Sequence, residues 1–393
     1  MYVRGWSKYS LIDIHGTEWK RVRTLLSPFF STSKLKDVSC IEVNDRIYRR
    51  MDERMNESST SSLCSAYTLD MICSSAFGLQ VDSQTDENDK FLALLRKLTN
   101  LTVGAKLMFI CFTFPFVTPL LELFGVNMFP RGYLKFFETM TKQLLNERLN
   151  NPSGRRDFIE TMARAHLDDI EDKSLGREGE SRKGLTNEEI LAQTLMFVQG
   201  GYDTTSRSLV LTMYCLALHP EVQEKVHREI LDVIGDKELT YDNLSKLKYM
   251  EMCINETTRC YPAFIRFDRR ATQDIVLDDG LHIREGTLVV VPVWAIHHDP
   301  NIYPDPDKFD PERFSPEACA NRNPLHHLPF GAGHRICLGM RLAQMAIKMA
   351  MVGAMKRFKF VPTDKTEVPL KLKKYSLLVL WDNSIHLGLE KRA

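Results

Sequence analysis

The ten residues Phe330-Gly-Ala-Gly-His-Arg-Ile-Cys337-Leu-Gly339 carry the strongest structural signal in the sequence. Their glycines permit positive φ angles and let the backbone pass close to a flat, bulky group. Cys337 precedes residues 339–358, whose apolar spacing predicts a long helix. At a helix start, the dipole and free N–H groups stabilise a thiolate. A lone thiolate in a glycine-rich loop suits an axial ligand of haem iron, although a buried structural thiol is the ordinary alternative for a single cysteine.

A second motif, Gly200-Gly-Tyr-Asp203-Thr204-Thr, lies in the middle of another predicted helix, at 187–219. A capping box of Thr186 and Glu189 begins this helix, and its length of about 30 residues suggests that it crosses the whole molecule. The adjacent glycines and threonines weaken the helical ladder, which predicts a local opening for water or dioxygen. An acid beside a hydroxyl can relay protons there. Taken alone, the motif could also be a simple helix irregularity.

Two further pairs of residues have a spacing that places them on one helix face. Glu256 and Arg259 stand three apart and can form an ion pair, which on a surface contributes little stability. Trp19 and Arg23 stand four apart and could hold an anion through their N–H donors.

These motifs together resemble the cytochrome P450 family, in which Phe, two Gly, Arg, Cys and Gly recur at the spacing found in residues 330–339. The resemblance covers essentially the whole chain, and it is closest to family 3 and its relatives. It implies a mainly α (α+β) haem domain with small β-sheets, formed as a single domain by residues 1–393.

The resemblance assigns a role to each motif. Cys337 is the axial ligand of haem b, and Asp203 and Thr204 belong to the oxygen-activation motif as catalytic residues. Glu256, Arg259 and Arg313, from Pro311-Glu-Arg-Phe314, form a structural charge cluster. The residues expected around the cofactor are Trp19, Arg23, Arg269, Phe330, Gly331, Arg335 and Gly339; those expected to contact substrate are Gln199, Gly200, Ala263 and Phe264.

The resemblance also implies an activity and its partners. Such enzymes insert one oxygen atom of O₂ into lipophilic molecules such as steroids, drugs and xenobiotics. Their electrons come from NADPH through NADPH–cytochrome P450 reductase, and in some members also through cytochrome b5. They lie on the cytosolic face of the endoplasmic reticulum membrane. A haem-thiolate isomerase of the thromboxane-synthase type is one alternative, although those relatives lack the acid–threonine pair. Another is a shortened, non-catalytic form that fails to hold haem.

The alternative of a shortened, non-catalytic form is suggested by the N-terminal part of the sequence. Family members carry about a hundred residues before the Trp19 helix, including a membrane anchor, the first helices and most strands of the first sheet. The sequence predicts that these are missing here.

Composition excludes several other classes of protein. Lys+Arg total 52 and Asp+Glu total 51, so the net charge of +1 speaks against a nucleic-acid binder. Hydrophobic residues at 44% and charged residues at 26% are typical of a folded globular chain. Nine scattered cysteines without a CxxC pair speak against a disulfide framework.

The remaining pattern is mostly helical. We expect Thr17 to cap a helix that stops near Pro28, and we expect residues 166–190 to be a solvated loop. The other predicted elements are helices at 36–55, 66–77, 220–235 and 247–260, strands at 275–277, 281–283 and 288–291, an ordered meander at 300–329, and closing strands.

Two features invite a different interpretation. Residues 107–121 carry no charge, but they are too few and too proline-broken to span a membrane. They predict a buried helix pair or a surface that dips into a bilayer as a peripheral contact. The pairs His297-His298 and His326-His327 suggest metal ligands, yet no further ligand has a suitable spacing, so we interpret them as loop residues.

Overall fold

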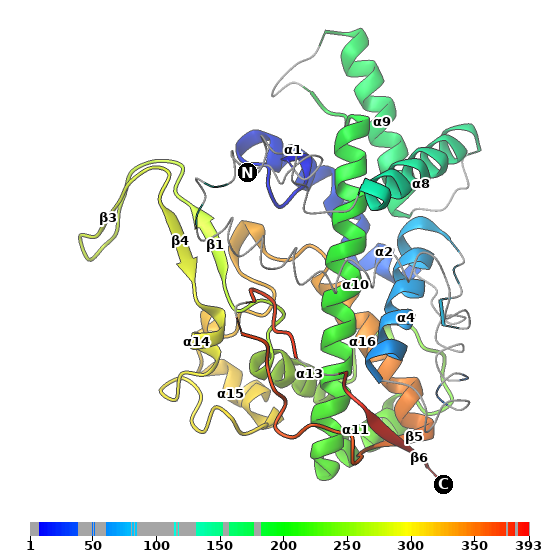
Figure 1. Cartoon of the computed structure of the whole chain (residues 1–393), viewed down its shortest axis with the longest axis vertical. Coiled ribbons are helices and arrows are strands. Elements are labelled where there is room, and N and C mark those ends of the chain that lie inside the picture. The colour runs from blue at the N-terminus through cyan, green and yellow to red at the C-terminus, as the bar shows by residue number, and fades with distance from the viewer. Residues whose placement is uncertain are drawn as a thin grey trace.

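The 32-residue helix α10 (Asn187–Leu218) runs through the centre of the structure, a computed structural model (Figure 1). The Thr186 side chain accepts from the Glu189 N–H, and the Glu189 side chain accepts from the Thr186 N–H. The predicted capping box and the length of the helix are therefore confirmed. The residues that the structure describes are 8–37, 49, 51, 60–79, 81, 83–84, 114, 117, 131–151, 157–176, 182–374, 376–381 and 384–392.

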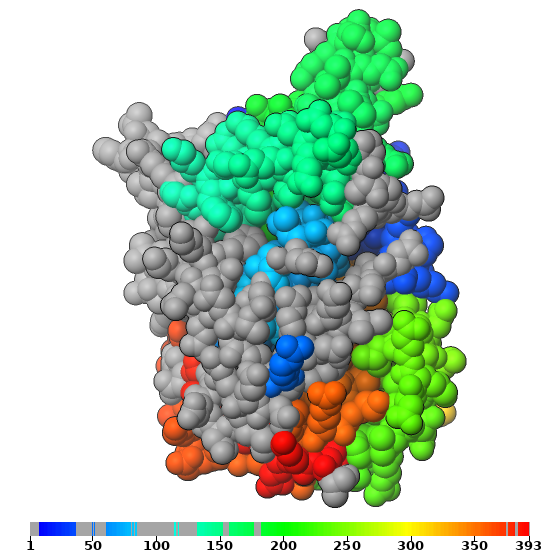
Figure 2. Space-filling view, turned by 90° about the vertical axis from the view of Figure 1, so that its right-hand side faces the viewer, coloured from blue at the N-terminus to red at the C-terminus, as the bar shows by residue number. Residues whose placement is uncertain are grey.

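The segments before α10 form helices and short helical turns, labelled α and η respectively. They are α1 (Gly16–Leu26), η2 (Ser27–Phe30), α2 (Thr32–Asp37), α4 (Thr60–Ile72), η3 (Cys73–Phe77), α8 (Arg131–Asn150) and α9 (Phe158–Ser174). Figure 2 shows α9 projecting at the top of one face, α8 lying across that face below it, and α4 further down.

The segments after α10 form the second half of the helical part. They are α11 (Pro220–Val233), α12 (Tyr241–Leu244), α13 (Lys248–Cys260), α14 (Val293–His297), η6 (Pro311–Phe314), α15 (Pro316–Ala320), η7 (Pro324–His326), η8 (Gly333–Arg335) and α16 (Met340–Arg357). The predicted helices at 220–235, 247–260 and 339–358 correspond to α11, α13 and α16, and the meander at 300–329 is ordered.

The described strands form small antiparallel sheets of two strands each. The pairs are β1 (Phe267–Arg270) with β4 (Leu288–Val291), β2 (Ile275–Val276) with β3 (His282–Ile283), and β5 (Phe358–Pro362) with β6 (Leu387–Lys391). The predicted hairpin and closing strands are confirmed. Strand β1 was not predicted, because Phe-Asp-Arg-Arg has no alternation of apolar and polar residues.

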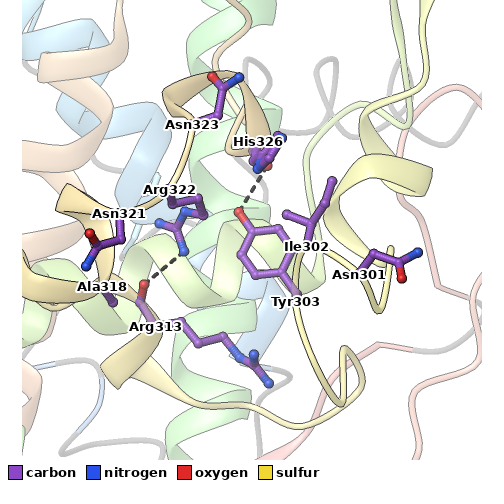
Figure 3. Close-up of a pocket in the computed structure, with 9 residues that line it drawn as sticks. All are labelled: Asn301, Ile302, Tyr303, Arg313, Ala318, Asn321, Arg322, Asn323 and His326. Carbon is purple, nitrogen blue, oxygen red and sulfur yellow. Dashed lines mark hydrogen bonds between the residues drawn. The ribbon is translucent and has the colours of Figure 1, made fainter.

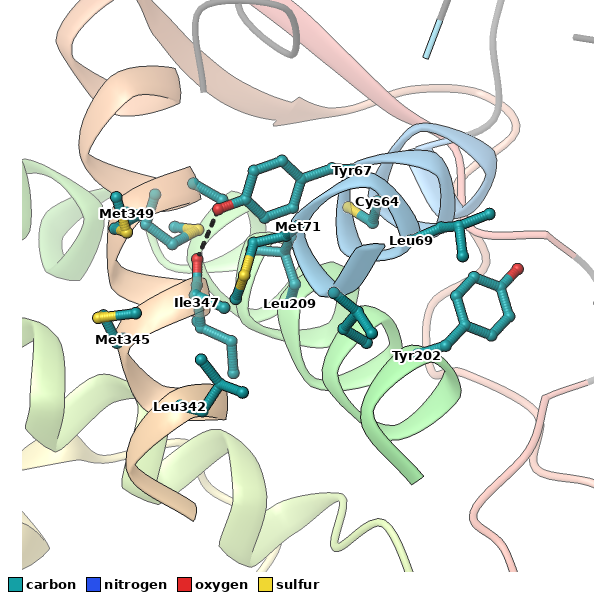
Figure 4. Close-up of a cluster of buried hydrophobic side chains, with 14 of the residues drawn as sticks. Cys64, Tyr67, Leu69, Met71, Tyr202, Leu209, Leu342, Met345, Ile347 and Met349 are labelled. Atoms are coloured by element: carbon teal, nitrogen blue, oxygen red, sulfur yellow. Dashed lines mark hydrogen bonds between the residues drawn. The ribbon is translucent and has the colours of Figure 1, made fainter. Parts of the chain in front are cut away.

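The core lies where α4, α10 and α16 pack together (Figure 4). Leu209 of α10 and Ile347 of α16 are almost fully buried, and burial of such a side chain contributes about 1.5–3 kcal/mol. The Tyr67 hydroxyl donates to the Ala346 carbonyl at 3.1 Å, which satisfies the one polar atom of that ring. Gly201 lies at the crossing of α4 and α10: a Cβ at this position would lie 2.8 Å from Ile72 Cδ1. A larger residue at position 201 would therefore have to displace the Ile72 side chain.

Two local predictions were wrong and one was confirmed. Helix α1 begins at Gly16 with His15 as its N-cap, so Thr17 lies inside the first turn. The predicted end of this helix near Pro28 is confirmed, because α1 ends at Leu26 and Pro28 lies in the first turn of η2, where its missing N–H is not needed. Residues 166–174 are helical rather than loop, because α9 places buried carboxylates such as Asp169 opposite Arg182.

Other predictions fall wholly or mostly outside the described residues. Of the uncharged stretch 107–121, the structure describes only Phe114 and Val117. Most of the helix predicted at 36–55 also lies outside the described residues. The helix predicted at 66–77 is confirmed as α4 with η3, and it ends at Gly78 in the left-handed conformation. None of the described helices combines the length and apolar character needed to cross a membrane.

Candidate haem-binding site

The loop before α16 holds the predicted ligand in a tight turn. The Cys337 N–H donates to the Phe330 carbonyl at 2.9 Å, which closes the loop across the motif. Gly331 and Gly333 both have φ of 72°, a conformation that residues with a Cβ rarely adopt. The glycines therefore shape the loop itself, as the sequence indicated. Gly339 caps α16, with Phe30 as the nearest side chain to its face.

Cys337 is one of two exposed thiols among the described residues, and Cys319 is the other. Although the residue is exposed, the atoms packed around it partly exclude water from the thiol and so raise the pKa of Cys337, while hydrogen bonds from Gly339 and Met340 and the charge of Arg23 act in the opposite direction. The predicted N–H contacts from the start of the helix are thus present, but the prediction was wrong about their net effect, because the pKa of the thiol is raised rather than lowered. A bound metal ion would displace the proton, and the same N–H groups would then stabilise the thiolate.

Arg335 joins this loop to the start of α1. Its guanidinium donates to the carbonyls of Leu11 and Ile14 at 3.4 and 2.8 Å. It also lies 4.8 Å from the centre of the Trp19 ring. Trp19 and Arg335, which the sequence could only place separately, are therefore in contact.

Arg23 and Arg269 lie near the same loop. One Arg269 amino group donates to the Ala332 carbonyl at 3.2 Å, inside the glycine-rich motif. Burial lowers the pKa of Arg335, and the charges of Arg269 and Arg23 lower it further. Like charges are thus held close together here. Among the described residues, none of these three arginines has a carboxylate within 4.0 Å.

The described residues fit haem. The exposed thiol supplies an axial ligand, and three guanidinium groups that have no carboxylate partner among these residues match the two carboxylates of the porphyrin. A Cβ added to Gly200 or Gly333 would meet no atom within 4 Å, so both backbones border open space.

The acid–threonine pair is present on α10, but the predicted opening of the helix is absent. Helix α10 is unbroken through Gly200, and the Thr204 hydroxyl donates to the Gly200 carbonyl at 2.5 Å. Because this bond forms inside the helix, threonine and glycine are accommodated without a break. The Asp203 carboxylate accepts from Arg207 Nε at 2.8 Å, and the Arg207 guanidinium lies 5.4 Å from the Trp381 ring centre. Arg207 stands four residues after Asp203 in α10, a spacing that places both on one helix face and could have indicated this pair.

The predicted substrate contacts lie on two different segments. Gln199 Nε2 donates to the Tyr133 hydroxyl at 3.3 Å, which links α10 to α8. Ala263 and Phe264 follow α13 and pair with the C-terminal segment, since the Val379 N–H donates to the Ala263 carbonyl. Phe264 is 45% exposed, so its ring is free to meet an apolar ligand.

The predicted charge cluster is completely assembled. Arg259 Nε donates to Glu256 at 2.7 Å, and both side chains have no exposed surface. Arg313 Nε lies 3.5 Å from the same carboxylate. Asp310 adds a backbone N–H to Glu256 at 2.9 Å. The pair is thus a buried cluster that ties α13 to the meander rather than a surface ion pair.

The meander also contains a polar cavity of about 350 Å³ (Figure 3). Tyr303 forms one wall, and its hydroxyl donates to the His326 carbonyl at 3.0 Å. Arg322 donates to the Arg313 carbonyl at 2.9 Å, so the cavity adjoins the charge cluster rather than the Cys337 loop.

The sequence analysis missed the role of two histidines beside this cluster. His297 is fully buried and ends α14, so the interpretation as a loop residue was wrong. Its ring stacks on His327 with centroids 5.5 Å apart. The described residues contain no group of three or more side chains suited to a metal ion. The apolar residues around His297, Val-Trp-Ala-Ile, could have indicated burial.

We expect these two histidines to make stability depend on pH. Burial lowers the pKa of both His297 and His327 to about 3, against 6.5 in an unfolded chain. Between these values the unfolded chain binds protons that the folded chain does not. Stability should therefore be full above pH 6.5 and fall at lower pH, by about 1.4 kcal/mol per pH unit for each histidine. Urea unfolding at pH 7, 6 and 5 measures this slope, which His297→Gln should reduce. A slope that is flat, or that the variant leaves unchanged, would contradict the assignment.

Comparison with known proteins agrees with this geometry. The sequence matches the cytochrome P450 family over residues 2–387. It is 38% identical to Cytochrome P450 3A9 of Rattus norvegicus, over 92% of this chain and 71% of that protein. It is also 38% identical to Cytochrome P450 3A6 of Oryctolagus cuniculus, over 95% of this chain and 74% of that protein. The chain therefore belongs to the cytochrome P450 family and is a haem-thiolate monooxygenase.

Proposed function

We propose that this enzyme oxidises lipophilic small molecules, of steroid or xenobiotic type, with O₂ and electrons from NADPH–cytochrome P450 reductase. Cytochrome b5 is a second donor in this proposal. The observation that carries it is the exposed Cys337 thiol beside three arginines that have no carboxylate partner in the part of the chain that the structure describes. When bound, thiolate-ligated haem supplies dioxygen activation and insertion of one oxygen atom into a C–H bond.

The chain's own residues would hold and orient the cofactor. Arg23, Arg269 and Arg335 would bind its carboxylates, and the Trp19 ring would keep the Arg335 guanidinium in place. The N–H groups of residues 339 and 340 would stabilise the thiolate. Each group requires little rearrangement, because the loop and α1 already hold it.

Proton delivery would use Thr204 and Asp203. The Thr204 hydroxyl donates to the Gly200 carbonyl, so its oxygen can still accept a hydrogen bond from a group in the open space beside Gly200. Asp203 lies one residue earlier, and its carboxylate is held by Arg207. For Asp203 to pass a proton toward Thr204, its side chain would turn away from this arginine.

The substrate would enter between α10 and the segment after α13. Phe264 offers an exposed aromatic face there, and Gly200 leaves room beside the helix. A lipophilic substrate suits such a surface, because apolar contact provides most of the binding energy. The location that accompanies this proposal is the cytosolic face of the endoplasmic reticulum membrane, with residues 107–121 as the peripheral contact.

One experiment tests the proposal as a whole. The purified chain is reconstituted with haem and the reductase, and a steroid is supplied with NADPH. Hydroxylated steroid that depends on NADPH and O₂ is the expected result. An enzyme that isomerises an endoperoxide without reductase would instead support the isomerase alternative. A chain that takes up no haem would contradict the catalytic proposal.

Thr204→Ala should uncouple electron consumption from product formation. Without the hydroxyl, the chain would lose the group proposed to direct protons at this position, so the product formed per NADPH should fall about tenfold or more. Thr204→Ser should restore most of the yield because it keeps the hydroxyl. The matched control is Ser208→Ala, since Ser208 makes the same type of bond one turn later, to the Thr204 carbonyl. Equal coupling in Thr204→Ala and the wild type would count against the relay.

A further inference from the structure

His297 makes two hydrogen bonds to two different parts of the site. Its Nδ1 lies 3.2 Å from the Arg259 carbonyl, and its Nε2 accepts from the Leu328 N–H at 2.8 Å. The Arg259 guanidinium in turn donates to the His297 carbonyl at 2.8 Å. The imidazole therefore stands between the buried charge cluster and the segment that leads into the Cys337 loop.

The partners fix the proton positions on the ring. The Arg259 carbonyl can only accept, so Nδ1 must carry the hydrogen. The Leu328 N–H can only donate, so Nε2 must be unprotonated. Full burial favours this neutral form, and a charged ring would direct an N–H against the Leu328 N–H. A single tautomer of His297 thus satisfies both backbone groups, the Arg259 carbonyl and the Leu328 N–H.

Leu328 connects the histidine directly to the ligand loop. Its carbonyl accepts from the Gly331 N–H at 3.0 Å, at the glycine whose φ is 72°. Two residues after Leu328, the Phe330 carbonyl accepts from the Cys337 N–H at 2.9 Å. Hydrogen bonds thus link Glu256 and Arg259 through His297 to Leu328, and the short backbone segment from Leu328 to Phe330 carries the connection to the residue proposed to bind iron.

We propose that His297 is a positioning residue that sets the conformation of the Cys337 loop by bridging the Arg259 carbonyl to the Leu328 N–H. The inference rests on the proposed role of Cys337 as the haem ligand. It predicts that the bond to Leu328 determines how well the thiolate is held. The bond to Arg259 anchors the ring.

Three substitutions separate the two bonds. His297→Gln can place an oxygen near the position of Nε2 and keep an acceptor for Leu328. His297→Asn reaches only to the level of Nδ1, so it keeps a donor for Arg259 but leaves the Leu328 N–H without a partner. His297→Phe retains a ring and loses both bonds. The first readout is the share of bound haem whose ferrous–CO complex absorbs at about 450 nm, the signature of thiolate ligation.

The second readout needs no haem. Amide hydrogen exchange at Leu328, measured in the cofactor-free protein, reports whether its N–H is still bonded. We expect exchange to be at least about tenfold faster in His297→Asn and His297→Phe, and near the wild-type rate in His297→Gln. The thiolate share should fall several-fold in the same two variants and be largely retained in His297→Gln.

Two controls distinguish positioning from general loss of stability. His298→Phe alters the neighbouring ring, which stacks on Trp294 with centroids 4.1 Å apart and, among the described residues, bonds to the Trp294 carbonyl rather than to the Cys337 loop. Tyr303→Phe removes the bond to the His326 carbonyl in the same meander. Both should keep the wild-type thiolate share.

The outcomes decide between the alternatives. A full thiolate share in His297→Asn, or an equal loss in His297→Gln and His297→Phe, would overturn the proposal. A loss in Tyr303→Phe as large as that in His297→Asn would do the same, because the effect would then be general. If His297→Phe does not fold, the comparison of Gln with Asn still decides. Failure of the wild type to show the band would instead refute Cys337 as ligand.

Discussion

Replacing Cys337 with serine should abolish the absorption band at about 450 nm of the ferrous–CO haem complex, because the hydroxyl cannot supply a thiolate to iron. The side chain is exposed and the loop is closed by the backbone bond to Phe330, so the variant should still fold. Monooxygenase activity should fall below detection, whereas secondary structure measured by circular dichroism should remain unchanged. The loss is large because no other described thiol lies in this loop.

The matched control is Cys319→Ser, which changes the other exposed thiol. Cys319 lies in α15, with its Sγ 3.5 Å from an Arg322 amino group. This variant should keep the full band and full activity. Retention of the band in Cys337→Ser, or its loss in Cys319→Ser, would show that the ligand has been assigned to the wrong residue.

Glu256→Gln should lower the free energy of unfolding by about 3–5 kcal/mol. The substitution keeps the shape of the side chain but leaves the Arg259 guanidinium, which has no exposed surface, without its counter-charge. It also weakens the acceptor for the Asp310 N–H and for Arg313. The effect exceeds that of an ordinary ion pair because a buried charge cannot be compensated by water. Urea unfolding monitored by fluorescence measures the change.

Lys248→Gln is the control in the same helix. Lys248 pairs with Glu251 at the same three-residue spacing, but its side chain is 74% exposed, so the loss should stay below about 0.5 kcal/mol. If Glu256→Gln does not fold, Arg313→Gln provides a milder test, since it keeps the Glu256–Arg259 pair. A loss under 1 kcal/mol in both cluster variants would contradict a structural role for the cluster.

Local patterns predicted the elements whose determinants lie close together in the sequence. The capping box at Thr186 and the apolar spacing that follows were enough to define α10. The spacing of Glu256 and Arg259 placed both on one face of α13. Their complete burial depends on the meander, which no local pattern describes.

The contacts that the sequence did not reveal join distant segments. Arg335 meets the start of α1 across more than three hundred residues. The Arg207 guanidinium of α10 lies over the ring of Trp381 near the C-terminus. The sign of the Cys337 pKa shift was likewise out of reach, because it depends on burial by neighbouring segments. These features are set by tertiary packing, which hydrophobic periodicity does not encode.

The contact of α4 with α10 at Gly201 also bears on how such enzymes can diverge. Because the Ile72 side chain of α4 packs directly on the Gly201 backbone, a larger residue at position 201 would have to displace Ile72 beside the turn that carries Asp203 and Thr204. Phe264 and the C-terminal segment that pairs with it lie on loops, where substitution is tolerated more readily. Evolution can therefore alter which molecules are accepted while the reaction itself is inherited unchanged.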